Sequence, residues 1–301
     1  MKANIIKYGN SLYLIELPVN LAGFNNFIGA WVYRGEKTVI IDPGPSSTVK
    51  PLCKALEKIK IKTPDYILLT HIHIDHSGSI GDIARIFNKT PIICHSAAFK
   101  HLINPNTLWK NSVTILKEKA YAYGKLKPVN ENMLIKAENF SGHNIKTIET
   151  PGHSAHSVSF IIDEHLFAGE ACGVYLKQNN NQQYLRPATP PKLFLKTAIK
   201  SIRKLIKLKP KKICFGHFGI SERPDTIMKK HITQLLLWEN IIKEAHKTQN
   251  PQSLFPYAFK KLLLQDKMLA VFKKLNKEVK KRELFFIKNS FNGFLQYLNK
   301  N

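Results

Sequence analysis

The stretch Thr70-His71-Ile72-His73-Ile74-Asp75-His76-Ser77-Gly78 determines how the rest of the chain is interpreted. It directly follows an apolar run, residues 66–69, which is typical of a buried strand. Side chains alternate in direction along an extended segment, so His71 and His73 point the same way, and the next two polar side chains fall where the chain begins to turn. Imidazoles and carboxylates bind zinc, iron and manganese, so one short loop could serve two metal ions. With only 12 histidines among 301 residues, such a cluster is hard to explain by composition.

Three later stretches each place a candidate ligand directly after an apolar strand. TPGHSAHSVSF, from residue 150, presents His153 at a Pro-Gly turn; LFAGEACG, from residue 166, presents Glu170; and CFGHFG, from residue 214, presents His217. Each of these residues alone is more simply explained as structural. Together, four strand-end loops that carry ligand side chains favour one composite metal centre. Asp42, at the end of another strand, either orients a ligand from behind or is an ordinary turn residue.

The four motifs, in this order and spacing, resemble those of the metallo-β-lactamase superfamily, and the resemblance covers residues from about 12 to 220. It implies an α/β fold, a four-layer αββα sandwich with two metal ions at one edge between the sheets. The residues that the resemblance implies as ligands are His71, His73 and His153 for one metal ion, Asp75, His76 and His217 for the other, and Glu170 as the bridge between them. Zinc is the expected metal, with iron or manganese as alternatives.

Two positions qualify the resemblance. Most hydrolases of the superfamily have Asp where this chain has Glu170, and the longer side chain can bridge only if the backbone sits back by about one methylene. His73 stands where the flavodiiron branch has Glu, which favours hydrolysis over redox chemistry. The Gly-Glu-Ala form at 169–171 resembles a prokaryotic branch of metallohydrolases that implies no agreed substrate.

The expected reaction is hydrolysis of an ester, thioester or lactone-type small molecule by a metal-bridging hydroxide, with Asp75 as the catalytic residue that orients the hydroxide and carries its proton. The chain has no G-x-S-x-G elbow that would supply a serine nucleophile. Four residues follow the ligand strands and are candidates for substrate contact, with packing roles left open: His156, Tyr175, Tyr184 and Arg186.

The net charge of +25 fits a nucleic acid, a membrane surface or an anionic substrate as partner. The excess is spread along a chain rich in Lys, Asn and Ile, which favours a compositional origin. A metal-dependent phosphodiesterase or ribonuclease that acts on nucleic acid is therefore the alternative function. The two functions differ in how substrate affinity depends on salt, because a protein that binds the phosphate backbone loses affinity steeply as salt rises.

Composition also limits the class of protein. Hydrophobic residues make up 44% of the chain, yet no run approaches the roughly 18 apolar residues of a membrane span. The N-terminus lacks the apolar region of a signal peptide, so a cytoplasmic enzyme without membrane contact is expected. The four cysteines are widely spaced and are expected to be reduced. A homodimer is left open.

The chain order predicts a catalytic domain, residues 1–220, followed by a basic α-helical extension, residues 221–301. Helices are expected at 224–247, 253–264, 268–281 and 284–298, in an arrangement resembling glyoxalase II-like members of the superfamily. The aromatic residues of the extension form either a wall of the substrate pocket or the extension's own core: Trp238, Phe255, Tyr257, Phe259, Phe285 and Phe286.

Overall fold

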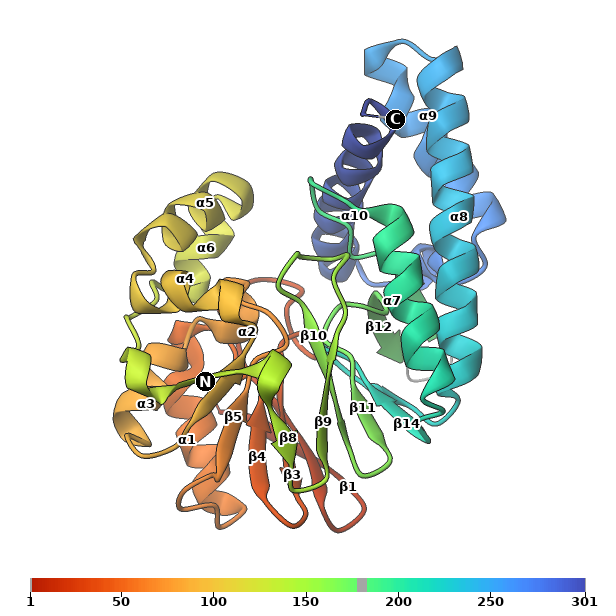
Figure 1. The fold of residues 1–301 in the computed structure, drawn as a ribbon. Helices are drawn as coiled ribbons and strands as arrows, with labels where there is room; N and C mark the ends of the chain where they lie inside the picture. The colour runs from red at the N-terminus through yellow and green to blue at the C-terminus, as the bar shows by residue number, and fades with distance from the viewer. Residues whose placement is uncertain (1, 178–182, 301) are drawn as a thin grey trace.

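The structure is a computed structural model and describes residues 2–177 and 183–300. Within these ranges two β-sheets pack face to face, and helices cover both outer faces (Figure 1). The first sheet contains, in spatial order, β1 (Asn4–Tyr8), β2 (Leu12–Glu16), β3 (Gly29–Arg34), β4 (Thr38–Ile41), β5 (Tyr66–Leu68), β6 (Ile92–Cys94) and β7 (Leu134–Lys136). Strands β1 to β4 pair antiparallel, and β4 to β7 pair parallel.

The second sheet is mixed as well. It contains, in spatial order, β15 (Ile220–Ser221), β14 (Lys212–Cys214), β11 (His165–Phe167), β10 (Val158–Ile162), β9 (Ile145–Glu149) and β8 (Ser141–Gly142). Strand β14 pairs parallel with β11, and β11, β10, β9 and β8 pair antiparallel in turn. A separate hairpin pairs β12 (Val174–Lys177) with β13 (Gln183–Arg186).

The helices lie between the strands and after them in the chain. The α-helices are α1 (Val49–Lys58), α2 (Ile74–Ser77), α3 (Ile80–Ile86), α4 (Phe99–Ile103), α5 (Asn106–Leu116), α6 (Glu118–Tyr123), α7 (Leu195–Lys207), α8 (Pro224–Thr248), α9 (Pro251–Gln265) and α10 (Lys277–Leu298). Short 3-10 turns are η1 (Ser46–Thr48), η2 (Ser96–Ala98), η3 (Glu131–Met133), η4 (Ala137–Asn139) and η5 (Leu269–Lys274).

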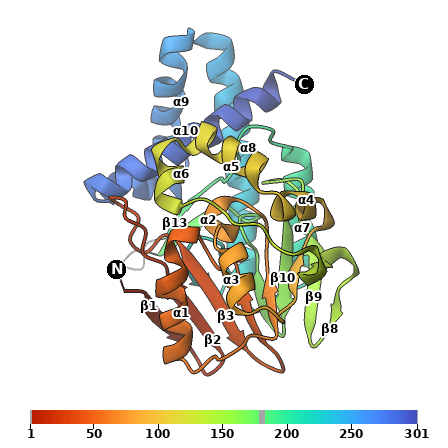
Figure 2. The same ribbon diagram turned by 90° about the vertical axis from the view of Figure 1, so that its left-hand side faces the viewer.

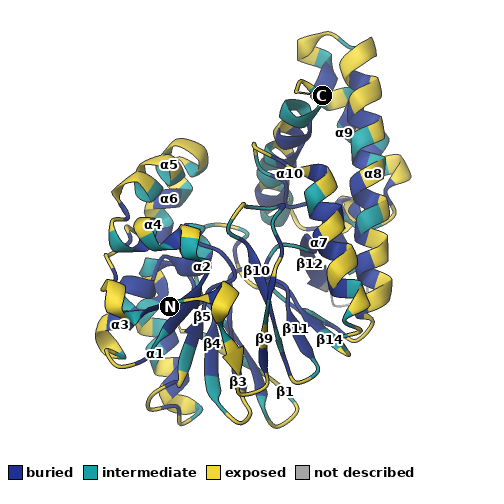
Figure 3. Ribbon diagram, viewed as in Figure 1, coloured by how far each residue is buried: buried dark blue, intermediate teal, exposed yellow. Residues whose placement is uncertain are grey.

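The core between the sheets comes from the strand alternation that the sequence shows. Leu14 and Trp31 of the first sheet belong to one buried cluster with Phe160 and Phe167 of the second. The indole Nε1 of Trp31 donates to the carbonyl oxygen of Phe215 at 2.9 Å, which ties the sheets together near the end of β14. Buried strands occupy the middle of the molecule and exposed residues its rim (Figure 3). The predicted αββα sandwich is therefore confirmed.

One predicted break is wrong. The sequence suggested that helices 268–281 and 284–298 are separate, but the second half forms the continuous helix α10, preceded by the 3-10 turn η5. The Asn276 side chain caps α10 by accepting from Val279 N at 2.9 Å. Arg282 and Glu283, which lie between the two predicted helices, fall inside α10, and both are buried. No helix in the described part of the chain combines the length and apolar character that crossing a bilayer requires.

Candidate metal centre

The four ligand-bearing loops meet at one edge of the sandwich because the strands before them run in the same direction. In the second sheet β9, β11 and β14 all end there, since β9 and β11 are both antiparallel to β10, and β14 is parallel to β11. In the first sheet β5 ends at this edge and leads into the short helix α2. The predicted ligands by loop are His71, His73, Asp75 and His76 after β5, His153 after β9, Glu170 after β11 and His217 after β14.

These side chains form compact groups of donor atoms. In each group the donor atoms lie within 4.8 Å of one another. One group contains His71, His73, His153 and Glu170; a second contains Asp75, His76 and His217; and a third contains Asp42, His71 and His76. The first two groups match the two ligand sets that the resemblance implied, and mixed imidazole and carboxylate donors suit divalent transition metals.

Glu170 lies between the two groups despite its extra methylene. Its Oε2 lies 3.3 Å from His71 Nε2 and 3.0 Å from His153 Nε2, both in the first group. Its Oε1 lies 3.1 Å from His217 Nε2 in the second group. The same Oε2 is also 3.7 Å from His76 Nε2 of the second group, so the Glu170 carboxylate lies between the two groups.

Two buried nitrogens test whether metal ions suit this cluster. His71 Nε2 and His76 Nε2 are buried, and neither has a hydrogen-bond partner among the described residues. Burial lowers the pKa of His71 well below its ordinary value, and the neighbouring His76 adds to this effect. An unpaired buried nitrogen costs stability, and a cation at the cluster would accept the lone pair that the neutral His71 ring presents. The residues present therefore fit divalent metal ions.

The carboxylates make the cluster electrostatically favourable for cations. Burial opposes protonation of His76, but Asp75, Asp42 and Glu170 outweigh burial and raise its pKa to about 9. Burial also opposes ionisation of Glu170, yet His153 and the other imidazoles beside it hold its pKa well below the ordinary value. The carboxylates thus stay charged and attract positive charge to the imidazoles, whether protons or metal ions.

Asp42 supports the cluster from behind. Its Oδ1 accepts from Thr70 N at 2.8 Å, and its Oδ2 accepts from Thr70 Oγ1 at 2.6 Å. The same Oδ2 lies 3.2 Å from His76 Nδ1, and Thr70 Oγ1 lies 3.0 Å from His71 Nδ1. One buried carboxylate therefore fixes the ring orientation of both histidines, the role that the sequence left open for it.

The histidines on the second sheet are held differently. His153 Nδ1 lies 2.8 Å from the carbonyl oxygen of Ala188, so a backbone group orients this ring. The ring of His217 stacks on Phe27, with ring centroids 4.2 Å apart and planes 19° from parallel. The Arg282 guanidinium lies 3.8 Å from the Phe27 centroid. A side chain of α10 therefore packs against the ring that supports His217.

Two glycines allow the ligand loops to approach one another. Gly169 has φ +54°, and a Cβ there would lie 2.6 Å from Thr70 Oγ1. A Cβ at Gly216 would lie 2.8 Å from the Gly169 carbonyl carbon, and Gly216 N donates to Gly169 O at 2.8 Å. Larger side chains would push the loops apart, so the glycines of the Gly-Glu and Phe-Gly-His motifs set the spacing of the cluster.

A cavity of about 440 Å³ opens in front of the cluster. Five predicted ligands line it: His73, Asp75, His153, Glu170 and His217. Of the four predicted substrate-contact residues, His156 and Arg186 line it too. This volume is in the range of small-molecule sites.

Tyr175 and Tyr184 correct the prediction of substrate contact. Both are buried, at 1% and 0% exposure, and neither lines the cavity. The Tyr175 ring stacks on Phe215, and the Tyr184 hydroxyl donates to Glu283 at 2.9 Å. Both tyrosines follow a ligand strand in the sequence, which suggested substrate contact. The β12–β13 hairpin that carries them packs under α8 and α10, so their rings belong to the core.

Sequence reasoning missed part of the cavity wall. Asn289 and Ser290 of α10 line the cavity together with Phe286. Of these three residues, Phe286 was among the aromatic residues predicted as a possible pocket wall. Trp238, which was also among them, is fully buried inside the helical region. Phe286 lies about seventy positions after His217, the last predicted ligand, so no local sequence signal could place α10 here.

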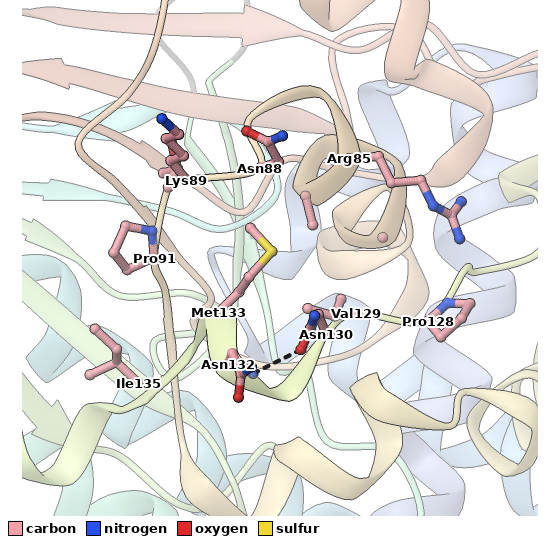
Figure 4. Close-up of a pocket in the computed structure, with 13 residues that line it drawn as sticks. Arg85, Asn88, Lys89, Pro91, Pro128, Val129, Asn130, Asn132, Met133 and Ile135 are labelled. Atoms are coloured by element: carbon pink, nitrogen blue, oxygen red, sulfur yellow. Dashed lines mark hydrogen bonds between the residues drawn. The ribbon is translucent and has the colours of Figure 1, made fainter.

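A second, larger hollow of about 910 Å³ lies away from the cluster, between α3 and the first-sheet edge strand β7 (Figure 4). Asn88, Asn130 and Asn132 line it together with Arg85 and Lys89. None of the described residues that line it is an acid, a histidine or a cysteine. It therefore lacks the groups that hydrolytic chemistry requires.

Comparison with known proteins gives a consistent result. The family model described as the metallo-beta-lactamase superfamily matches residues 27–217. A metallo-beta-lactamase fold-containing protein of Sulfurisphaera tokodaii is 32% identical over 238 residues, which cover 76% of this chain and 86% of that protein. A hydroxyacylglutathione hydrolase of Hamiltonella defensa is 27% identical over 210 residues, which cover 68% of this chain and 66% of that protein.

Solved structures share the fold. The crystal structure of an archaeal metallo-beta-lactamase superfamily protein from Sulfolobus tokodaii aligns with a TM-score of 0.69 at 24% identity, over 96% of this chain and 100% of that chain. A metallo-beta-lactamase family protein from Thermus thermophilus aligns with a TM-score of 0.65 at 17% identity, over 96% of this chain and 93% of that chain. Both alignments extend into the helices after the second sheet.

Proposed function

We propose a specific hydrolytic function for this chain, which belongs to the metallo-β-lactamase superfamily. Membership makes it a metallohydrolase of that superfamily. The proposal adds two divalent metal ions, zinc first with iron or manganese as alternatives, and a small ester, thioester or lactone as substrate. The seven predicted ligands, from His71 to His217, hold these ions.

The position of Glu170 carries the proposal. Its Oε2 lies 3.0 Å from His153 Nε2 of the first group and 3.7 Å from His76 Nε2 of the second, and its Oε1 lies 3.1 Å from His217 Nε2 of the second. A carboxylate so placed can serve two ions at once, which supports a binuclear site over a mononuclear one. When bound, the ions supply Lewis acidity that polarises the scissile carbonyl and makes water nucleophilic near neutral pH.

The chain's own residues orient the reactants. Asp75 lines the cavity, with its Oδ2 3.8 Å from both His76 Nε2 and His217 Nε2, so it is placed to accept a proton from the attacking water. His156 Nε2 accepts from Ile72 N at 3.3 Å. Burial lowers the His156 pKa to about 3, so the ring is neutral and its Nδ1–H remains available to donate to a substrate oxygen.

The thioester class is supported by similarity and by size. Several similar proteins are named hydroxyacylglutathione hydrolase, which is a thioester-cleaving activity. The cavity of about 440 Å³ suits a small molecule better than a nucleic-acid strand. A cytoplasmic location, a catalytic domain of residues 1–220 and a helical extension of residues 221–301 belong to the same proposal.

The test compares a simple thioester with an activated phosphodiester, before and after chelation and after restoration of Zn²⁺, Fe²⁺ or Mn²⁺. The proposal expects thioester turnover that chelation abolishes and metal restores, with little dependence on salt. Dominant phosphodiester turnover that falls steeply with salt would replace it with the nuclease alternative.

A further inference from the structure

Helix α5 leaves part of its apolar surface uncovered by the core. Four of its apolar side chains are half-buried and pack against the core: Leu108, Trp109, Val113 and Leu116. None of its residues in the described ranges is fully buried (Figure 3), and Ile115 is 49% exposed. Ile115 is therefore the apolar side chain of this helix that the core leaves uncovered.

That face borders the same cavity as the ligand cluster. Leu108, Ile115 and Leu116 of α5 line the cavity, opposite Phe194 of the loop before α7 and Phe286 of α10. Helices α5 and α6 overlap α10 in Figure 2 but stand apart from it in Figure 1, and Lys119 Nζ of α6 lies 4.1 Å from the Phe285 ring centroid. We call the part of the cavity that these apolar side chains line the arm; polar residues of the same helices also line the cavity, among them Asn111, Ser112 and Asn289.

The arm offers little to an anionic group. The Lys and Arg residues among the described cavity-lining residues are Arg186 and Lys192. Arg186 is buried, and its guanidinium is already engaged with Glu283. Lys192 is exposed. A peptide-like thiol with two carboxylates would find few free cations here, whereas a hydrocarbon chain would contact apolar side chains of α5 and α10 and Phe194.

We propose that this arm binds the hydrocarbon chain of an acyl substrate, so that the enzyme prefers medium-chain acyl thioesters or esters to short or polar ones. This inference rests on the proposed hydrolytic function and adds the substrate class. The acyl carbonyl lies at the ligand cluster, and the chain extends along α5 past Ile115 towards Phe194. Water attack at the carbonyl breaks the acyl–sulfur bond, and the thiol leaves with one proton and the fatty acid with the hydroxyl oxygen.

The test uses acetyl, butyryl, hexanoyl and octanoyl thioesters of N-acetylcysteamine with the full-length, metal-restored enzyme. Each methylene that enters the arm raises kcat/KM by roughly threefold to fourfold. Ile115→Gln should lower the octanoyl value by roughly tenfold and leave the acetyl value unchanged. Ile86→Gln is the matched control, because Ile86 is 51% exposed on α3 and lies outside this cavity.

A binding measurement separates the two ideas. Calorimetry with acetate, butyrate and octanoate reports the arm without turnover, since the carboxylate is constant and only the chain changes. If no thioester is hydrolysed but octanoate still binds more tightly than acetate, the proposed hydrolytic function is refuted, and hydrocarbon binding in the arm is supported. Equal kcat/KM values along the thioester series, together with equal affinities for the three carboxylates, would refute binding of a hydrocarbon chain in the arm. A preference for a lactoyl thioester of glutathione over the octanoyl substrate would also refute it.

Discussion

The two sides of the cavity are built in different ways. The ligand side consists of short loops after strands of the sandwich, and its side chains are imidazoles and carboxylates. The opposite side consists of helices, and Leu108 of α5 and Phe286 of α10 are among its residues. The difference indicates a division of labour, in which the sandwich edge provides the chemistry and the helices shape what can approach it.

A buried carboxylate stabilises each side. Behind the ligands, Asp42 is 2% exposed and accepts hydrogen bonds from Thr70. Behind the helical wall, Glu283 is 0% exposed and accepts from Tyr184, and it is ion-paired with Arg186 and Arg282. The first is tied to metal binding, whereas the second is tied to folding of the wall, so substitutions at the two sites should have separable effects.

The largest expected effect is on the ligand side. His71→Ala should remove bound metal and reduce hydrolysis to the level of the chelated protein, because the first ligand group loses its most buried imidazole. Metal analysis and activity assays measure this, with circular dichroism to check the fold. His143→Ala, at an exposed histidine paired with Glu36, should change neither. Full activity with intact metal content in His71→Ala would refute the ligand assignment.

The next effect is on the helical side. Glu283→Gln leaves two buried guanidinium groups without their carboxylate and should destabilise the fold by about 3–5 kcal/mol. Denaturant unfolding measures this loss. Glu244→Gln, which breaks the exposed pair with Lys261, should leave the free energy of unfolding nearly unchanged. Similar losses of unfolding free energy in both variants would contradict the structural role of Glu283. Metal content per folded molecule should stay unchanged in both variants.

The pH dependence of the unfolding free energy tests the same buried ion pairs of Glu283. Burial opposes ionisation of Glu283, but Arg186 and Arg282 lower its pKa from 4.5 to about 2. A depressed pKa stabilises the fold above pH 4.5, and this stabilisation is lost as the pH falls through about 2. The stability gap between wild type and Glu283→Gln should therefore narrow by about 3 kcal/mol between pH 5 and pH 2. A gap that stays constant over this range would argue against the ion pair.

The smallest effect concerns support of the ligands. Asp42→Asn keeps an acceptor for Thr70 N but removes the charge behind His76, and should weaken metal affinity by about 10-fold to 100-fold. Competition with a chelator measures the affinity. Asp65→Asn is the control, because Asp65 also accepts from a backbone N–H, that of Thr38, but lies away from the cluster. Equal affinities in both variants would show that Asp42 is only a turn residue.

The sequence predicted the ligand side far better than the helical side, for a physical reason. Each ligand follows an apolar strand, and parallel strands bring their ends to one edge, so local patterns were enough to place Glu170 and His217 together. The helical wall depends on contacts between distant segments. Arg186 and Glu283 are 97 positions apart, and no local pattern distinguishes a buried ion pair from two solvated charges.

The same reasoning explains why Tyr175 and Tyr184 have the packing role that the sequence left open and do not line the cavity. Both follow a ligand strand, as His156 does, but the hairpin that carries them turns under α8 and α10. Whether a strand-end tyrosine faces a cavity or a core depends on which helix covers it. That covering helix lies far along the chain, beyond the reach of sequence periodicity.

The separation of Arg186 from Glu283 also bears on how the chain is made. Synthesis proceeds from the N-terminus, so every predicted ligand up to His217 leaves the ribosome before α10 is complete. Until α10 forms, the cavity is open on one side and Arg186 lacks its carboxylate. The cavity wall is thus the last part of the site to be completed during synthesis.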